Sequence, residues 1–216
     1  MIVLNLVNTT GEFVLGKTVA EEARRAVVIE ERQSTAMGDK GKLTSAQREK
    51  IVQAFIGKFY ADFFFWVSLV GAVVQLFFVS RILKHVGVSG ALFFLPVISL
   101  AGYSLIAFFP ILGYIQLAKI FENSTDYSLQ NTARQALFLP TSREAKYKAK
   151  AAIDTFFVRM GDVLSAVVVF IGTYWLLNTK AFATINVALV AVWLLLVVVV
   201  GRHYRKFTLA EVKATA

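Results

Sequence analysis

The sequence predicts an all-α integral membrane protein with six transmembrane helices. Its 216 residues are 57% hydrophobic and their mean hydropathy is +0.63, which is too apolar for a soluble domain. The apolar residues form continuous blocks of about 18 residues or more, the length that crosses a bilayer as a helix. Spanning β-strands would instead alternate apolar and polar residues over about ten positions. We therefore expect a single membrane domain over residues 1–216.

The first helix is expected at about residues 2–32 and carries a polar stripe. The chain is apolar from its first residues but lacks the basic region of a signal peptide. Asn5, Asn8 and Glu12 fall within about 100° of one another around a helix. A charged run from Lys17 onward indicates exit into water, and residues 33–43 have the small, polar and glycine residues typical of a loop.

The second and third helices are expected at about residues 44–86 and 88–109. Thr44 followed by Gln47 predicts a capping box at the start of the second helix. Gly87 indicates a short turn between the two helices. Pro96 lies inside the third helix, and neighbouring helices of a membrane bundle can accommodate a proline there.

The last three helices are expected at about residues 110–138, 150–177 and 182–206. Pro110 favours the first turn of the fourth helix, and Pro140 ends that helix. Gly161 and Ser165 give the fifth helix a small-xxx-small face, which suits close contact with another helix. The sixth helix has no charged residue before Arg202.

The fourth helix carries a stripe of polar and charged residues. Six residues fall within one sector of about 120° on a helix: Lys119, Glu122, Asn123, Asp126, Gln130 and Arg134. A charge at the centre of a spanning helix costs about 2.5–3.5 kcal/mol on insertion scales. The stripe should therefore line an aqueous cavity or pair inside a bundle.

The distribution of Lys and Arg predicts the orientation. The turn after the second helix, the loop after the fourth and the C-terminal tail share one side and hold Arg81, Lys84, Arg143, Lys146, Lys148, Lys150, Arg202, Arg205 and Lys206. The short connections on the other side hold only Lys180. By the positive-inside rule the first side is cytoplasmic. We expect a multi-pass protein of the cell inner (plasma) membrane with both termini in the cytoplasm.

The polarity of the helices suggests an internal repeat. When the six helices are divided into two groups of three, the striped helix comes first in each group, and the third of each group is almost purely apolar. Secondary transporters are often built from inverted three-helix repeats, and each half of a major facilitator transporter is such a unit. The pattern predicts half of a major-facilitator-type bundle, with a 3+3 inverted repeat.

One segment carries a resemblance to a known family. Its features are Tyr127, Ser128, Thr132, Arg134, Pro140, Lys146, Lys148, Lys150, Asp154, Arg159 and Gly161. With them, residues 125–162 resemble the tenth and eleventh helices of the ATP/ADP translocase family, the nucleotide transporters of plastids and intracellular bacteria. Members of that family have twelve helices, so the resemblance is to their C-terminal six-helix half alone. It implies an N-terminal six-helix half as a separate or missing segment, with a homodimer of identical halves as another alternative.

The chain departs from the family pattern at one position. Where the family typically continues Gly-Lys-Ser, this chain has Gly161, Asp162 and Val163. An anion in place of a cation removes an expected partner for a substrate phosphate.

We predict a secondary active transporter of a small anionic metabolite, such as ATP, ADP or another nucleotide, working by alternating access. Lys119 and Arg134 would attract the anion, while Glu12, Glu122 and Asp126 would couple protons or hold the cations when the site is empty. The full set of candidate substrate-binding residues is Asn5, Asn8, Glu12, Lys119, Glu122, Asn123, Asp126, Tyr127, Gln130, Arg134, Lys150, Asp154 and Asp162.

Other interpretations stay open. Lys119 and Glu122 form an i,i+3 pair that could belong to an internal salt-bridge ladder without substrate. The chain could also be a non-transporting membrane scaffold or subunit, or a major facilitator transporter of an unrelated solute. The cationic run at residues 143–150 is expected to contact anionic membrane lipid.

Several function classes are not expected. There is no cysteine, and the two histidines do not cluster, so we expect no metal site. No cofactor motif, HExxH, Walker loop or catalytic triad pattern occurs, which argues against an enzyme. The net charge of +9 comes mostly from residues that flank apolar blocks, which indicates a topology signal rather than nucleic-acid binding.

Overall fold

A computed structural model describes residues 1–36, 43–139 and 141–215, without the side chains of residues 36, 154 and 207–215. Most of the loop expected at residues 33–43, and Pro140, lie outside the described residues. Within this part of the chain every element is helical and no strand occurs. The predicted all-helical fold is therefore confirmed.

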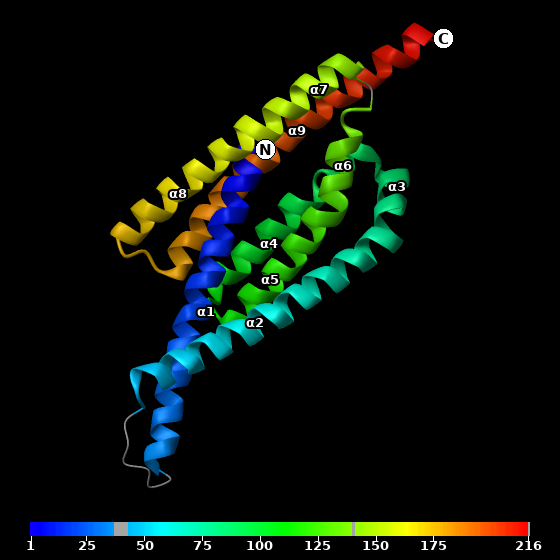
Figure 1. Ribbon diagram of the computed structural model, residues 1–216. Coiled ribbons are helices and arrows are strands. Elements are labelled where there is room, and N and C mark those ends of the chain that lie inside the picture. The colour runs from blue at the N-terminus through cyan, green and yellow to red at the C-terminus, as the bar shows by residue number, and fades with distance from the viewer. Residues whose placement is uncertain (37–42, 140, 216) are drawn as a thin grey trace.

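The first helix is longer than expected. α1 spans Ile2–Ala36 without interruption, and its second half extends past the other helices together with the start of α2 (Ser45–Val73) (Figure 1). The Arg48 guanidinium and the Glu31 carboxylate form an ion pair of 2.7 Å between these two helices. At the start of α2 the expected capping box is confirmed, because the Thr44 and Gln47 side chains each bond the other residue's backbone N–H.

α2 continues through the π-helical segment η1 (Val74–Phe78) into α3 (Val79–Ala91). The break before the next rod lies at Gly87, whose φ is 75°. A residue with a Cβ rarely adopts that conformation, so glycine fits this turn. α4 (Phe94–Phe108) follows and contains Pro96 near its start.

The second half of the chain repeats the use of π-helical segments. α5 (Leu112–Thr125) runs through η2 (Asp126–Gln130) into α6 (Asn131–Ala136). α7 (Arg143–Ala152) runs through η3 (Ile153–Phe157) into α8 (Val158–Tyr174), and α9 spans Thr179–Thr215. α7 begins ahead of the start expected near Lys150, because the Ser142 hydroxyl caps it by accepting from the Ala145 N–H at 3.3 Å.

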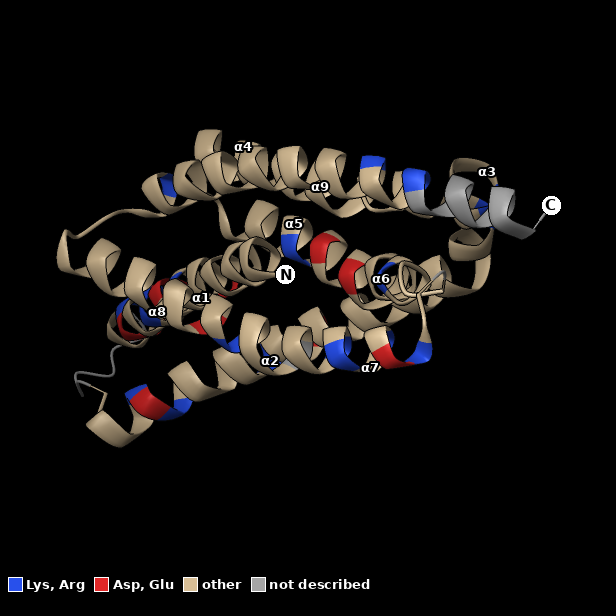
Figure 2. Cartoon of the chain, turned by 90° about the horizontal axis from the view of Figure 1, so that it is seen from above, with Lys and Arg blue, Asp and Glu red and all other residues tan. Residues whose placement is uncertain are grey.

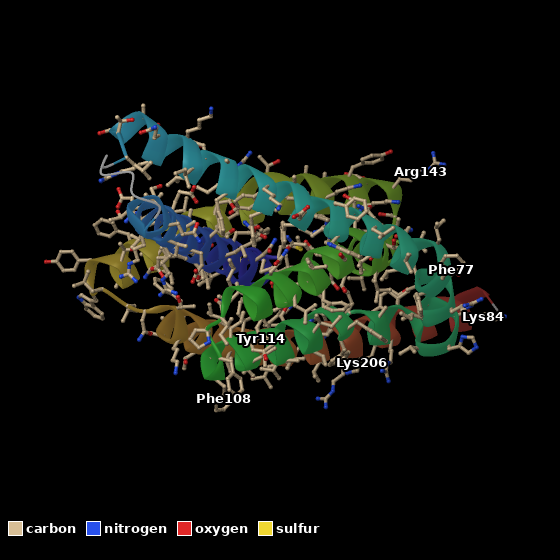
Figure 3. All side chains as sticks on the ribbon, turned by 90° about the horizontal axis from the view of Figure 1, so that it is seen from below. Phe77, Lys84, Phe108, Tyr114, Arg143 and Lys206 are labelled. Atoms are coloured by element: carbon tan, nitrogen blue, oxygen red, sulfur yellow. The ribbon has the colours of Figure 1, made fainter. Side chains whose placement is uncertain are left out.

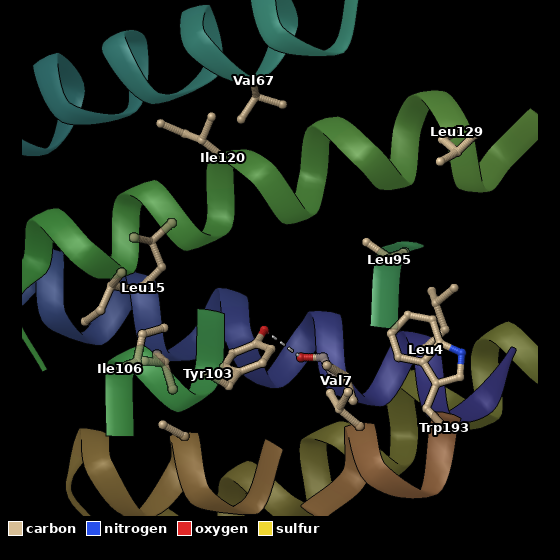
Figure 4. Close-up of a cluster of buried hydrophobic side chains, with 14 of the residues drawn as sticks. Leu4, Val7, Leu15, Val67, Leu95, Tyr103, Ile106, Ile120, Leu129 and Trp193 are labelled. Atoms are coloured by element: carbon tan, nitrogen blue, oxygen red, sulfur yellow. Dashed lines mark hydrogen bonds between the residues drawn. The ribbon is translucent and has the colours of Figure 1, made fainter. Parts of the chain in front are cut away.

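The helices are arranged in layers around α1 and α5. Figure 2 shows α4 and α9 together on one side, α1 and α5 in the middle, and α2 and α7 on the opposite side, with α8 beside α1. α1 packs against α2, α5, α8 and α9, and α4 packs against both α5 and α9. Apolar side chains fill the space between these layers, among them the fully buried Val7, Leu15 and Ile106 (Figure 4).

Within the described residues, three helical stretches are long and apolar enough to cross a membrane. They are Ser45–Ala91, Arg143–Tyr174 and Thr179–Lys206. α4 is also apolar but shorter. α1 and α5 carry polar stripes, which lower the mean hydropathy of these two helices. These features fit a membrane protein.

α8 and α1 approach each other closely at Gly161. A Cβ on Gly161 would lie 2.8 Å from the Cβ of Asn5 and 3.2 Å from the carbonyl oxygen of Ile2. Gly161 and Ser165 are both buried, and Ser165 has no exposed surface. The small-residue face expected on this helix is therefore a helix–helix contact.

We predict that Gly161→Ala destabilises the fold, because the added methyl group would force α1 and α8 apart. Overpacking of this kind costs about 1–3 kcal/mol, and each kcal/mol shifts the midpoint of a chain of this size by about 2–4 °C. Thermal unfolding of the detergent-solubilised protein, followed by tryptophan fluorescence, measures the shift.

Gly57→Ala is the matched control. A Cβ at Gly57 would meet nothing within 4 Å, and alanine favours a helix interior over glycine by about 0.5–1 kcal/mol. A midpoint that rises in both variants would contradict the tight α1–α8 contact.

Candidate functional site

A buried lysine lies at the centre of the bundle, between α1 and α5. Lys119 on α5 has 1% of its surface exposed. Its Nζ donates to Asn8 Oδ1 at 2.8 Å, Glu122 Oε2 at 2.8 Å and Glu12 Oε1 at 3.2 Å. An ammonium group has three N–H donors, so each donor of Lys119 has an acceptor. Asn8, Glu12, Lys119, Glu122 and Asn123 are called the lysine network below.

The inner end of the lysine network is Glu122, which is 4% exposed. Besides Lys119, its carboxylate accepts hydrogen bonds from Ser99 Oγ at 3.1 Å and from the Tyr103 hydroxyl at 2.9 Å. Buried carboxylates are tolerated when they are paired and hydrogen-bonded in this way. Both extra donors come from α4, so the network joins three helices.

Ser99 and Tyr103 were missed by the sequence analysis, which treated the third helix as almost purely apolar. The available signal was their i,i+4 spacing, which places both on one face of the helix. The Tyr103 hydroxyl also lies 3.3 Å from the carbonyl oxygen of Val7 (Figure 4). One side chain thus contacts both α1 and α5.

The outer end of the lysine network is Glu12, whose side chain is 40% exposed. Its Oε1 accepts from Asn123 Nδ2 at 2.9 Å as well as from Lys119. With Glu12 and Glu122 ionised, the two carboxylates and one ammonium sum to a formal charge of −1. We call Glu12, Lys119 and Glu122 the ion triad. Its partly exposed end is the Glu12 carboxylate, which accepts from the Lys119 ammonium.

Gly11 makes room for the lysine network. A Cβ at this position would collide with the Tyr103 hydroxyl and lie 3.2 Å from Lys119 Nζ. Gly11 was not among the candidate residues predicted from the sequence. Its requirement comes from side chains on two other helices, which no local sequence pattern contains.

The polar stripe of the fourth helix divides at η2. In a π-helical turn the hydrogen bonds run from i to i+5, so residues beyond the turn are rotated relative to a continuous α-helix. Lys119, Glu122 and Asn123 lie before this point and join the network. We expected Gln130 and Arg134 to share a face with these three residues, because we assumed a regular helix. In the structure neither Gln130 nor Arg134 joins the lysine network.

Arg134 lies instead at a cleft of about 250 Å³ whose lining includes Gln130 and Trp193. Its guanidinium donates to Asn131 Oδ1 at 3.1 Å and approaches the sulfur of Met1 at 3.7 Å. Asp126 is the first residue of η2 and lies between the two groups in the sequence. No hydrogen bond to its carboxylate occurs among the described residues.

The remaining candidates lie outside the lysine network. Asn5 donates to Asp162 Oδ1 at 2.5 Å and to the Val158 carbonyl at 3.0 Å, and Asp162 also pairs with Arg159 at 3.5 Å. These contacts join α1 to α8, so Asp162 serves the helix packing.

Lys150 donates to Gln135 at 3.1 Å on the surface. The side chain of Asp154 lies outside the described residues. Tyr127 is 63% exposed and lines a groove between η2 and α2.

Several buried polar atoms have no hydrogen-bond partner within the described residues, and one of them, Asn123 Oδ1, belongs to the lysine network. They are Thr10 Oγ1, Asn123 Oδ1, Gln130 Oε1 and Asn186 Oδ1. A buried group left in this state costs about 1–3 kcal/mol. Such atoms suit a site that exchanges its contacts with water or a ligand.

The comparisons with known proteins identify the family of the chain. Residues 52–204 match the family model described as TLC ATP/ADP transporter. The chain is 25% identical over 164 residues to ADP,ATP carrier protein 1 of Chlamydia pneumoniae, covering 63% of this chain and 31% of the relative. It is 29% identical over 125 residues to the protein of the same name from Chlamydia trachomatis, covering 48% and 23%.

The chain therefore spans about a third or less of the length of these curated relatives. No solved structure matches it significantly. The family match includes Lys119, Glu122 and their α4 partners, and it covers most of the chain. The chain belongs to the TLC ATP/ADP transporter family.

Proposed function

We propose that the chain forms a nucleotide-translocating membrane unit, in which the lysine network binds the phosphates of the substrate during alternating access. The observation that carries this proposal is Lys119, a fully coordinated ammonium buried between two glutamates of different helices in a TLC-family protein. A buried ionisable group in a membrane bundle is typical of substrate or ion pathways.

The geometry indicates how a nucleotide would engage the site. Glu12 is the half-exposed acceptor of Lys119, whereas Glu122 is buried and held by Ser99 and Tyr103. An incoming phosphate oxygen has the same charge and acceptor chemistry as Glu12 and takes its place on the ammonium. Glu12 then leaves towards water, and Asn8 remains as the α1 residue that bonds Lys119, so the polar contact between α1 and α5 is weakened. Substrate binding is in this way coupled to the contact between the two helices.

The packing supports an inverted repeat of three helical rods. Over the described residues the rods of the first group are α1, α2–η1–α3 and α4, and those of the second are α5–η2–α6, α7–η3–α8 and α9. Exchanging the groups turns the α1–α8 contact into α5–α2 and the α1–α9 contact into α5–α4, and all four occur. Secondary transporters use such repeats for alternating access. We infer six spans in a major-facilitator-type unit.

A second unit would complete the cavity. Contact of exposed polar side chains with lipid tails would cost free energy. The side chains concerned are the partly exposed Glu12 and the exposed Tyr127, Gln75 and Asn131. In a major-facilitator arrangement a second six-helix unit faces the first across the substrate site. We assign that place to a partner half, supplied by another chain or segment.

A binding measurement with labelled ATP on the chain in lipid nanodiscs tests the proposed function. We predict that Glu12→Gln tightens binding several-fold, because a neutral amide oxygen competes less well for Lys119 than a carboxylate does. Lys119→Met combined with Glu122→Gln avoids an unpaired buried charge and should weaken binding about 10- to 100-fold, since hydrogen bonds to charged groups contribute about 1.5–3 kcal/mol.

The exposed Lys148, which pairs with Glu144, supplies the control Lys148→Gln, and it should bind like the original chain. Absence of nucleotide binding by the unaltered chain would refute the proposed function. Equal affinities in all variants would refute the role of Lys119.

We predict that Gly11→Ala weakens ATP binding at least several-fold, because the methyl group would displace the Tyr103 hydroxyl and crowd Lys119 Nζ. The same nanodisc assay measures the effect, together with the thermal midpoint. Gly11→Ala combined with Tyr103→Phe removes the colliding hydroxyl and should recover part of the binding. No recovery would show that the methyl group acts elsewhere.

The cationic ends of the rods support a cytoplasmic orientation for one end of the bundle. Figure 3 shows Lys84 and Arg143 towards one end of the view, and Phe108 and Tyr114 away from that end. By the positive-inside rule the cationic end faces the cytoplasm of the cell in which the protein is made.

The chain contains no cysteine, which allows a direct test of orientation. We predict that Lys84→Cys in intact cells resists a membrane-impermeant maleimide, while Lys180→Cys is labelled, because both side chains are exposed at opposite ends. Labelling after cell lysis controls for reactivity. Protection of Lys180→Cys and labelling of Lys84→Cys would reverse the orientation.

A further inference from the structure

A polar groove lies beside the lysine network, between the second and fourth rods. Its volume is about 590 Å³, within the range of about 300–1,000 Å³ of small-molecule sites. One wall comes from α2 and η1 and includes Phe64, Ser68 and Gln75. The other comes from η2 and α6 and includes Tyr127 and Asn131.

Both walls contain a π-helical segment. η1 and η2 pack against each other, and the groove includes Gln75 from η1 and Tyr127 from η2. Isolated π-helical turns are rare and are frequent at functional sites, where they redirect a side chain. Two of them facing each other indicate a site rather than a packing defect.

The groove is polar but carries no charge. None of its lining side chains is Lys, Arg, Asp or Glu. Phosphate groups prefer cations, so this groove suits an uncharged part of a ligand. Val67 of the lining accepts a hydrogen bond from Ser124 at 2.9 Å, and Ser124 directly follows Asn123 of the lysine network, so a ligand could fill the groove and reach the lysine network together.

The lining side chains match a purine that carries an amino group. Tyr127 and Phe64 are 63% and 54% exposed and offer aromatic faces on which a base can stack. Gln75 and Asn131 each present an amide donor and acceptor, the pair that recognises the N6 amine and ring nitrogen of adenine. Guanine presents two acceptors on that edge and is recognised by Arg or Lys, which this groove lacks.

We propose that the groove between α2–η1 and η2–α6 is the adenine subsite, with Tyr127 stacking on the base and Gln75 reading its amino edge. This assignment rests on the proposed function, which supplies the nucleotide. It separates the two ends of the ligand: the base contacts the second and fourth rods, and the phosphates contact Lys119 on the fourth.

The same face cannot lie against lipid tails at low cost. Gln75, Asn131 and Ser68 are exposed, and a polar group in hydrocarbon without a hydrogen-bond partner is strongly unfavourable. Lipid acyl chains are therefore a poor occupant. The two walls meet where Ser124 of α5 donates to the Val67 carbonyl of α2 at 2.9 Å.

The test measures binding of ATP, GTP, CTP, UTP and inorganic triphosphate to the chain in nanodiscs. Tyr127→Leu should weaken binding of all four nucleotides by about 5- to 150-fold, the range for loss of one stacking aromatic, and leave triphosphate unchanged. Tyr127→Phe keeps the ring and should behave like the original chain. Gln75→Leu should reduce the preference for ATP over GTP about tenfold.

Gln116→Leu is the matched control, because Gln116 is an amide that lines a different cavity, beside Trp66. It should change neither affinity nor preference. If the original chain binds ATP and Tyr127→Leu or Gln75→Leu matches it for every ligand, the groove assignment fails and the proposed function stands. An equal loss for nucleotides and triphosphate would also overturn the assignment. If the original chain binds every nucleotide only as well as it binds triphosphate, the base contributes nothing and the groove assignment fails, while the phosphate contact to Lys119 stands.

Discussion

An ammonium group held between two carboxylates inside a membrane bundle is the constraint on which this structure depends. Lys119 is almost inaccessible, and its three acceptors come from α1 and α5. Removal of one partner from a buried ion pair typically costs about 3–5 kcal/mol, because a charge is left unpaired. The triad therefore fixes how α1 and α5 approach each other, and the other helices pack around that pair.

The packing near the triad follows from its geometry. Gly11 leaves space for the Tyr103 hydroxyl, and Gly161 lets α8 approach Asn5 on the opposite side of α1. Tyr103 and Ser99 extend the network to α4. α1 is thus in contact with neighbours on several sides through small residues and polar bonds, whereas α4 and α9 meet mainly through apolar side chains.

The sequence allowed the fold class to be predicted because long apolar blocks have one stable form in lipid. The capping box at Thr44 and the small face at Gly161 were local patterns and could also be read. The separation of Arg134 from Lys119 could not be predicted, because a π-helical turn leaves no periodic signal in the sequence. Its effect is to rotate the residues that follow it around the helix axis. Ser99 and Tyr103 were missed because their role depends on α5, which is distant in sequence.

The unbroken course of α1 has a mechanical consequence. Its 35 residues correspond to about 52 Å at 1.5 Å per residue, against a hydrocarbon thickness of about 30 Å. The same rigid rod holds Glu12 in the bundle and Glu31 in the extension that pairs with Arg48 of α2. A tilt of α1 that frees Glu12 would therefore also move the extension that contains Glu31. A ligand or antibody that binds this extension and holds it in place would act on the buried charges from outside the bilayer.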